Sequence, residues 1–149
     1  MRNQAADRVF VMRWAITIVL SLMVFAANAQ NVVSEGVWTH IDYDVEGKWQ
    51  IVRDDQGLAV VLDEAFETPH GPDLHILLSR KRIDQLSDEN ASEGALIVGP
   101  LTTTDDSTFF RKTRGAQTLR LPEGVDLGSW RTILIHCVKH SHLWAGSAL

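Results

Sequence analysis

Short apolar stretches alternate with turn residues from residue 36 to residue 149, and none repeats at helical spacing over a useful length. Alternation of this kind, broken by Gly, Pro and Asp, is typical of β-strands joined by turns. It predicts strands at residues 37–41, 48–53, 58–62, 74–79, 95–98, 108–111, 118–121 and 132–138, and a last strand reaching residue 149. About seven to nine short strands at this spacing favour an all-β, antiparallel β-sandwich.

The segments between these strands carry signals of their own. Asp54-Asp55-Gln56-Gly57 predicts the turn of a hairpin between residues 48–53 and 58–62. Residues 68–73 contain two prolines and a glycine, which predicts a fixed loop shaped by Gly71 and Pro72. We expect Asp73 to hydrogen-bond the backbone of that loop. Residues 80–93 are polar, charged and aperiodic, so we expect the longest surface excursion there.

The strand predicted at residues 132–138 and the residues after it gather most of the reactive side chains. They contain the only cysteine, Cys137, and three of the six histidines. Because side chains alternate along a strand, Cys137 should share a face with aliphatic residues. His136, His140 and His142 should line the opposite face if the strand runs on unbroken. Imidazoles two residues apart on one face can bind one ion, so these histidines are a candidate Cu(II) or Zn(II) site.

The first 29 residues have the order of a secretory signal peptide. A basic start with three arginines precedes a twelve-residue, mostly apolar run at residues 14–25 and the cleavage signal Ala27-Asn28-Ala29. The run is shorter than the roughly 20 residues that a membrane span needs. We expect cleavage after Ala29, export to the periplasm or the outside, and no stable membrane anchor afterwards. Translation starts at Met1 or Met12; residues 30–35 are then a polar lead-in and residues 36–149 one domain.

Composition narrows the classes of function. Loss of three arginines and one aspartate with the leader takes the formal charge from −5 for the whole chain to −7. Nucleic acids select basic surfaces, so we expect no nucleic-acid partner. With one cysteine the chain forms no internal disulfide, and in an oxidising compartment that thiol is buried, paired between chains, ligated or exposed for function. The sequence contains no serine–histidine–acid set, phosphate loop, paired-carboxylate motif or CxxC pair, which disfavours a hydrolase or conventional oxidoreductase.

Four motifs in order resemble one known family. They are Gly71-Pro72-Asp73-Leu74 before residues 76–79, Gly99-Pro100-Leu101, Leu119-Arg120-Leu121-Pro122, and Ile133-Leu134-Ile135-His136-Cys137 with an aromatic residue seven positions later. Their order and spacing are similar to the DM-thirteen domain, described as an electron-transfer module of extracellular proteins and often found beside DOMON domains. The resemblance covers residues 36–149. It implies an all-β domain with one characteristic cysteine, here Cys137, that works in redox chemistry as a bare thiol or as the ligand of a prosthetic group.

The sequence departs from that family pattern at two positions near the cysteine. Tryptophan usually precedes the cysteine, where this chain has His136, and an aromatic residue usually follows three positions later, where it has His140. Both changes replace an apolar ring by a potential ligand, so Cys137 and His136 are the candidate cofactor ligands. The cofactor stays open, with haem, a copper ion and a zinc ion as the candidates.

Three functions remain open from the sequence. The first is redox or electron transfer outside the cytoplasm, centred on Cys137 and served by an unknown redox partner. The second is a non-catalytic binding or adhesion module for an extracellular ligand, in which Cys137 is structural, because free cysteine packs as a small hydrophobe. The third is a metal-binding protein that uses the histidine face.

Overall fold

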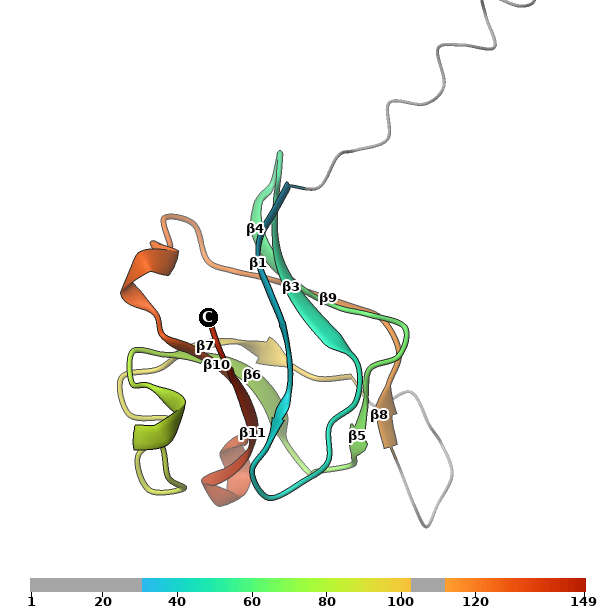
Figure 1. The fold of residues 1–149 in the computed structure, drawn as a ribbon, viewed down its shortest axis with the longest axis vertical. Helices are drawn as coiled ribbons and strands as arrows, with labels where there is room; N and C mark the ends of the chain where they lie inside the picture. The colour runs from blue at the N-terminus through green and yellow to red at the C-terminus, as the bar shows by residue number, and fades with distance from the viewer. Residues whose placement is uncertain (1–30, 103–111) are drawn as a thin grey trace, which may run out of the picture.

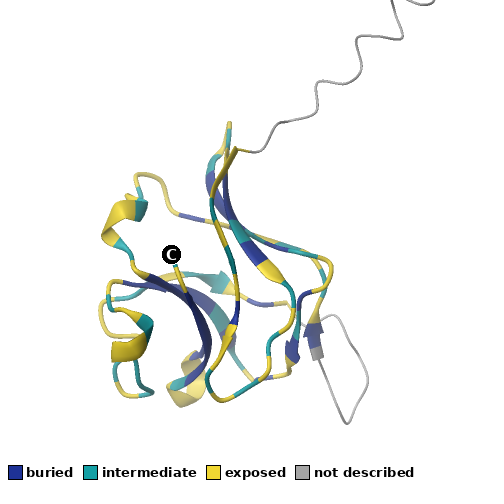
Figure 2. Cartoon of the chain, in the orientation of Figure 1, coloured by how far each residue is buried: buried dark blue, intermediate teal, exposed yellow. Residues whose placement is uncertain are grey.

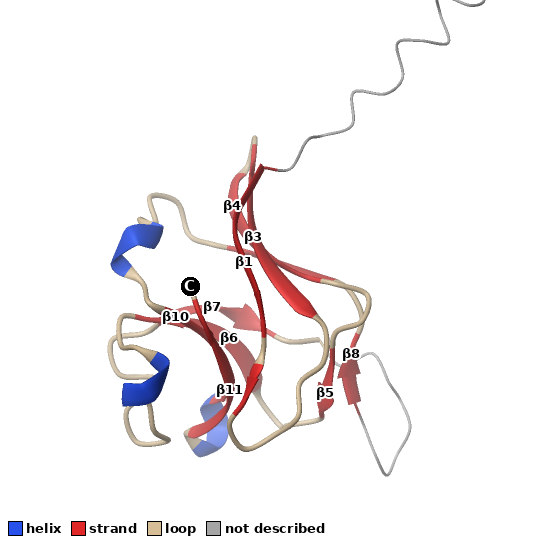
Figure 3. Cartoon of the chain, in the orientation of Figure 1, coloured by secondary structure: helices blue, strands red, loops and turns tan. Residues whose placement is uncertain are grey.

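The structure, a computed structural model, describes residues 31–102 and 112–149. The expected leader at residues 1–29 and the expected edge strand at 108–111 lie outside the described residues. The described residues form eleven β-strands, all paired antiparallel, and three single 3-10 turns (Figures 1 and 3). The expected all-β antiparallel fold is confirmed. No helix in the described part of the chain has the length and apolar character to cross a bilayer.

The first sheet contains four strands in the order β1-β3-β4-β9. Its edges are β1 (Asn31–Val37) and β9 (Gln117–Arg120), and its centre is formed by β3 (Lys48–Asp54) and β4 (Gly57–Leu62). The centre is the predicted hairpin, with Asp54 opposite Gly57 across its turn. The turn forms because Gly57 accepts a φ of +109° and the Gln56 amide donates to Asp54 Oδ1 over 2.9 Å.

The second sheet contains five strands in the order β2-β11-β10-β6-β7. Its central strand, β10 (Thr132–Cys137), pairs with β11 (His142–Ala148) on one side and β6 (Leu74–Ser79) on the other. Both faces of β10 are covered, so all of its residues are buried. The edges are β2 (Thr39–His40) and β7 (Leu96–Pro100), and a separate two-stranded ribbon joins β5 (Glu67–Pro69) to β8 (Lys112–Arg114).

The two larger sheets enclose the main core, to which both contribute alternate side chains. Buried residues, dark blue in Figure 2, lie in strands of both sheets. Face-to-face packing of two sheets forms a sandwich and buries one face of each. The first sheet supplies Trp49, Ile51, Leu58, Val60, Leu62 and Leu119, and the second supplies Leu74, Ile76, Leu78, Ile133, Ile135, Cys137 and Trp144. Each fully buried side chain of this size stabilises the fold by about 1.5–3 kcal/mol.

A smaller core covers the outer face of the second sheet. Leu77, Leu134 and Leu143 point away from the main core and pack with Ala91. Ala91 belongs to the connection between β6 and β7, which also contains the 3-10 turn η1 (Ile83–Gln85). Residues 80–93, expected as a surface excursion, therefore form a cover over the sheet. The cover is tied down where Thr132 Oγ1 donates to the Lys81 carbonyl over 2.9 Å.

The N-terminal end of the domain corrects one expectation. Residues 31–35, expected to belong to a polar lead-in, form most of β1, and Gly36 lies opposite Trp49 in the ladder with β3. A Cβ on Gly36 would lie 2.7 Å from Trp49 Cζ2, so glycine lets β1 lie against this ring. The strand is hard to read from sequence because an edge strand with a solvated face needs few apolar residues.

Candidate functional site

The hairpin of β10 and β11 places the candidate residues. β10 ends at Cys137, residues Val138–His140 form the 3-10 turn η3, and β11 begins at His142. Ser141 closes the turn in the left-handed conformation, with φ 49° and ψ 48°. The strand does not run on unbroken from residue 132 to residue 142, so the alternation expected for His140 and His142 does not apply. His140 lies exposed on the turn, and His142 lies across the ladder from Cys137.

The thiol of Cys137 faces the main core. The residue is 1% exposed and belongs to the same cluster as Ile133 and Ile135, as the alternation along the strand predicts. Its partners in the ladders are Leu74 on β6 and His142 on β11. These surroundings shield the thiol of Cys137 from reagents and from other chains. Because thiol chemistry needs an accessible thiolate, they also disfavour direct reaction at this residue.

His136 faces the other way, into the outer layer of the second sheet. It is 1% exposed, lies opposite His75 on β6, and its Nδ1 has no hydrogen-bond partner among the described residues. Burial lowers the pKa of His136; Asp88 opposes this shift, whereas His142 and His75 add to it. The structure thus keeps His136 and Cys137 on opposite faces of β10. The two candidate cofactor ligands cannot hold one group while that strand is intact.

His142 lies between two carboxylates at the end of the hairpin. Its Nε2 is 3.0 Å from Asp42 Oδ2, and its Nδ1 is 3.1 Å from Asp88 Oδ2. The rings of Tyr43 and Trp144 contact it edge-on, at centroid distances of 5.7 and 6.0 Å. The imidazole is thus held from several directions, although its side chain is 30% exposed.

The expected three-histidine metal site is not assembled. His136 is buried in the outer layer and His140 is exposed on the turn. Of the three, His142 alone belongs to a group of three potential ligands among the residues that the structure describes. The other two are Asp42 and Asp88: one ligand atom from each of the three residues lies within 4.8 Å of the others. Sequence reasoning missed both aspartates, because neither has a spacing that relates it to His142.

The loop that precedes β6 encloses the end of this hairpin. Trp144 Nε1 donates a buried hydrogen bond to Thr68 Oγ1 over 2.8 Å. A Cβ on Gly71 would lie 2.6 Å from Leu74 Cδ2 and 3.2 Å from Trp144 Cη2, so only glycine lets the loop backbone approach these side chains. The Val138 amide donates to the Asp73 carbonyl over 3.0 Å, which ties the loop to the turn after Cys137.

The side chains of the loop differ in part from expectation. The Asp73 carboxylate lies 3.4 Å from His75 Nδ1, and within the described residues it makes no hydrogen bond to the backbone of its own loop. Pro72 is exposed and contributes through its ring constraint alone. The loop is held by the backbone of Asp73 and by the fit of Gly71 against Trp144.

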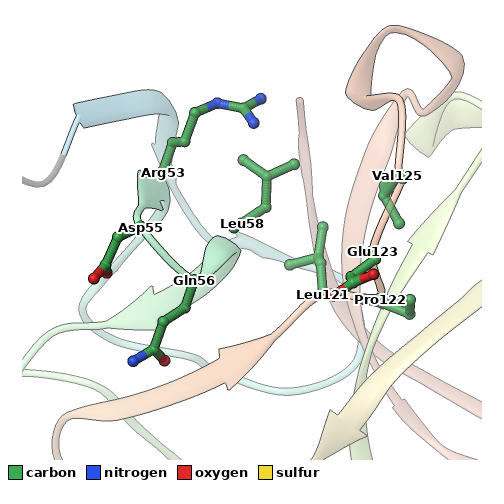
Figure 4. Close-up of a pocket in the computed structure, with 10 residues that line it drawn as sticks. Arg53, Asp55, Gln56, Leu58, Leu121, Pro122, Glu123 and Val125 are labelled. Atoms are coloured by element: carbon green, nitrogen blue, oxygen red, sulfur yellow. The ribbon is translucent and has the colours of Figure 1, made fainter.

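A hollow of about 330 Å³ lies elsewhere, between the β3–β4 turn and residues 121–125 (Figure 4). Its buried residues, Leu58 and Leu121, are joined by a backbone hydrogen bond of 2.9 Å. Charges of both signs line it, from Arg53, Asp55 and Glu123, but neither a histidine nor a cysteine does. The hollow therefore shares nothing with the chemistry gathered around the hairpin.

The family model of the electron transfer DM13 domain matches residues 39–145. The chain belongs to this family. The match includes β2 to β10, Cys137 and most of β11, and the description of the family attributes an electron-transfer type of function to it. Neither the curated proteins nor the solved structures contain a match to the chain. The resemblance found in the four motifs is thereby confirmed.

Membership in the DM13 family raises the question of a prosthetic group on Cys137. To bind a haem iron, the sulfur of Cys137 must be accessible to the iron and must face a cavity that can hold the porphyrin ring. Cys137 is instead packed among aliphatic side chains at 1% exposure, and His136 faces the other layer. The residues present do not fit a haem held by Cys137, and a metal ion on this thiol would have to displace core packing.

Proposed function

We propose that this chain is an exported electron-transfer domain whose redox group is the bare thiol of Cys137. Membership in the electron transfer DM13 family supports the class of function, and the basic, apolar and Ala-Asn-Ala order of residues 1–29 supports export. Cys137 is the only cysteine of the chain, and all three methionines lie in the leader. After cleavage of the leader, the sulfur of Cys137 is therefore the one sulfur atom that redox chemistry could use.

The stacked pair of Tyr43 and Trp144 carries the proposal. The ring centroids are 3.7 Å apart with an angle of 16° between the planes, so the two π-systems overlap face to face. Trp144 is buried in the same core cluster as Cys137, and Tyr43 is half-buried at the edge of that cluster. An electron can cross packed side chains without either end being exposed, so the pair offers a route between the shielded thiol and the surface.

The redox step is a one-electron oxidation. The S–H bond of Cys137 breaks, leaving a thiyl radical, one proton and one electron. The electron passes through Trp144 and Tyr43 to a one-electron oxidant on a partner protein, and the proton leaves to solvent. Because one proton accompanies one electron, the midpoint potential falls by roughly 59 mV for each unit rise in pH.

Voltammetry of the mature chain tests this proposal. Wild type should show a reversible signal with that pH slope, and Cys137→Ser should lose the signal while keeping the circular dichroism spectrum of the folded protein. Tyr43→Leu should slow electron exchange without moving the midpoint potential. Trp130→Phe is the matched control, because Trp130 lies under Arg80, 5.0 Å from its guanidinium carbon, and outside the stacked pair. An unchanged signal in Cys137→Ser would disprove the role of the thiol.

A second function is favoured by one observation, the burial of Cys137. A thiol at 1% exposure packs like a small hydrophobe, and a binding or adhesion module needs nothing more from it. A wild-type chain that gives no voltammetric signal and whose thiol reacts with labelling reagents only after denaturation would argue against electron transfer and favour the binding or adhesion module.

A further inference from the structure

We infer that Asp42, Asp88 and His142 form a binding site for a divalent transition-metal ion. The three residues come from separate parts of the chain: the loop after β2, the cover between β6 and β7, and the start of β11. One ligand atom from each lies within 4.8 Å of the others. The site differs from the three-histidine set that the sequence suggests, and it does not depend on the thiol of Cys137.

The hydrogen-bonding capacity of His142 is the first argument. Both ring nitrogens lie within 3.1 Å of a carboxylate oxygen, one from Asp42 and one from Asp88. A neutral imidazole has one N–H, so it satisfies one carboxylate and turns a lone pair toward the other. Two lone pairs facing each other at this distance repel. A cation between the bare nitrogen and the carboxylate that faces it removes the repulsion and uses the lone pairs as ligands.

The fit of the geometry is the second argument. Nitrogen and oxygen ligands lie about 2.0–2.2 Å from Zn²⁺, which sets the ligand atoms about 3–4 Å from one another around the ion. The ion is bound by one ring nitrogen of His142, and the contact of that nitrogen, 3.0 Å for Nε2 with Asp42 or 3.1 Å for Nδ1 with Asp88, falls in that range. The remaining separations between ligand atoms lie within 4.8 Å. The carboxylate on the far side of the ring must rotate toward the ion to complete the site.

The surroundings also hold the ligands in place. The Leu143 amide donates to Asp88 Oδ1 over 2.6 Å, which leaves Oδ2 directed at the imidazole. The rings of Tyr43 and Trp144 fix the plane of His142. Hydrogen bonds and packing that orient ligands in this way typically change metal affinity by about 10–100-fold. Partial exposure of all three side chains leaves positions on the ion for water.

The donor set selects the class of ion. One imidazole nitrogen and two carboxylate oxygens suit borderline divalent ions such as Zn²⁺, Mn²⁺ and Fe²⁺, whereas Ca²⁺ and Mg²⁺ prefer oxygen alone and Cu(I) prefers sulfur. Two carboxylates also neutralise the charge of such an ion. Zn²⁺ is the simplest probe, and Co²⁺ reports the same site through its visible absorption.

The competing arrangement is a protonated His142 that donates to both carboxylates and binds no metal. Titration calorimetry of the chelator-treated mature chain with zinc chloride at neutral pH distinguishes the two. We expect one Zn²⁺ per chain, and an affinity at least about tenfold weaker in both His142→Ala and Asp42→Asn. Visible absorption of the Co²⁺ form should disappear in the same variants. Asp42 is exposed, so its variant keeps the test valid if His142→Ala fails to fold.

Two control variants define the site. His140→Ala removes an exposed imidazole two positions away, and Asp44→Asn removes an exposed carboxylate two positions from Asp42 that contacts His40 instead. Both should bind Zn²⁺ with wild-type affinity. Absence of binding in wild type, or wild-type affinity in Asp42→Asn, would overturn the inference. So would a loss in His140→Ala as large as that in His142→Ala. Binding involves no electron transfer, so its failure leaves the proposed redox function of Cys137 untouched.

Discussion

Replacement of Gly71 by alanine tests whether the loop before β6 holds the hairpin that carries Cys137. The added Cβ would lie 2.6 Å from Leu74 Cδ2, 2.8 Å from Leu74 Cγ and 3.2 Å from Trp144 Cη2. Neither neighbour can move freely. Leu74 is buried in the main core, at 3% exposure, and the Trp144 ring is hydrogen-bonded to the Thr68 hydroxyl. The backbone or the core must shift to admit one methyl group.

The cost follows from these contacts. Overpacking of a filled core typically destabilises a protein by about 1–3 kcal/mol. Alanine restricts the unfolded chain more than glycine does, which offsets about 0.4–1 kcal/mol of that loss of stability. We expect a net loss of about 1–2 kcal/mol in the free energy of unfolding. With a urea dependence of about 2 kcal/mol/M, the midpoint falls by about 0.5–1 M.

Gly128→Ala is the matched control, because the nearest atom to its added Cβ is the exposed Asp126 Oδ1, 3.3 Å away. This variant should stay within about 0.5 kcal/mol of wild type. Labelling of native Cys137 adds a second readout: it should be faster in Gly71→Ala, since the loop also accepts the Val138 amide through Asp73. Equal urea midpoints and equal labelling rates in the two variants would refute the role given to this loop.

Three further predictions concern other parts of the chain. Trp144→Phe should lower the free energy of unfolding by about 1–3 kcal/mol in urea, because the buried Thr68 hydroxyl loses its partner; a Thr68→Val background should abolish most of that loss. His136 is disfavoured in its charged form by burial, so the unfolded state takes up the proton more readily. Wild-type stability should therefore fall as pH drops through the ordinary histidine range near about 6.5, whereas His136→Leu, measured in chelator, should lack this slope and be no less stable at neutral pH. Finally, intact-mass measurement of exported protein should give a chain beginning at Gln30, and a retained leader would contradict the cleavage site.

The face of Cys137 could be predicted from the sequence, but the place of His142 could not. Alternation along a strand is a local property, and the aliphatic residues at 133 and 135 mark the inward face of β10. The end of that strand depends on the η3 turn, which contains neither glycine nor proline. Its left-handed residue is Ser141, a type that seldom adopts this conformation. Without a turn signal, the pattern continues the strand through residue 142 and misses the turn that starts a new strand at His142.

The cluster around His142 is out of reach of sequence reasoning for a different reason. Asp88 precedes His142 by 54 residues and lies in a segment whose polarity indicates solvent. Its position is set by tertiary packing, because Ala91 and Leu86 cover Leu134 and so bring the cover down onto the second sheet. Short apolar residues scattered in a charged segment give no periodic signal. Only the folded sandwich brings Asp42, Asp88 and His142 together.

His142 belongs to the proposed metal site and is also the ladder partner of Cys137, the proposed redox group. A variant of His142 therefore cannot test one proposal without affecting the other. Cys137 and His142 are cross-strand partners, so their Cβ atoms are expected about 4.5–5.5 Å apart on the same face. Loss of the imidazole would thus alter the packing beside the thiol as well as the cluster with Asp42 and Asp88. Asp42 makes no pairing with β10 and is exposed, so its removal affects the cluster alone. A voltammetric signal that persists in Asp42→Asn, together with Zn²⁺ affinity that persists in Cys137→Ser, assigns electron transfer to the core face of the hairpin and metal binding to its end.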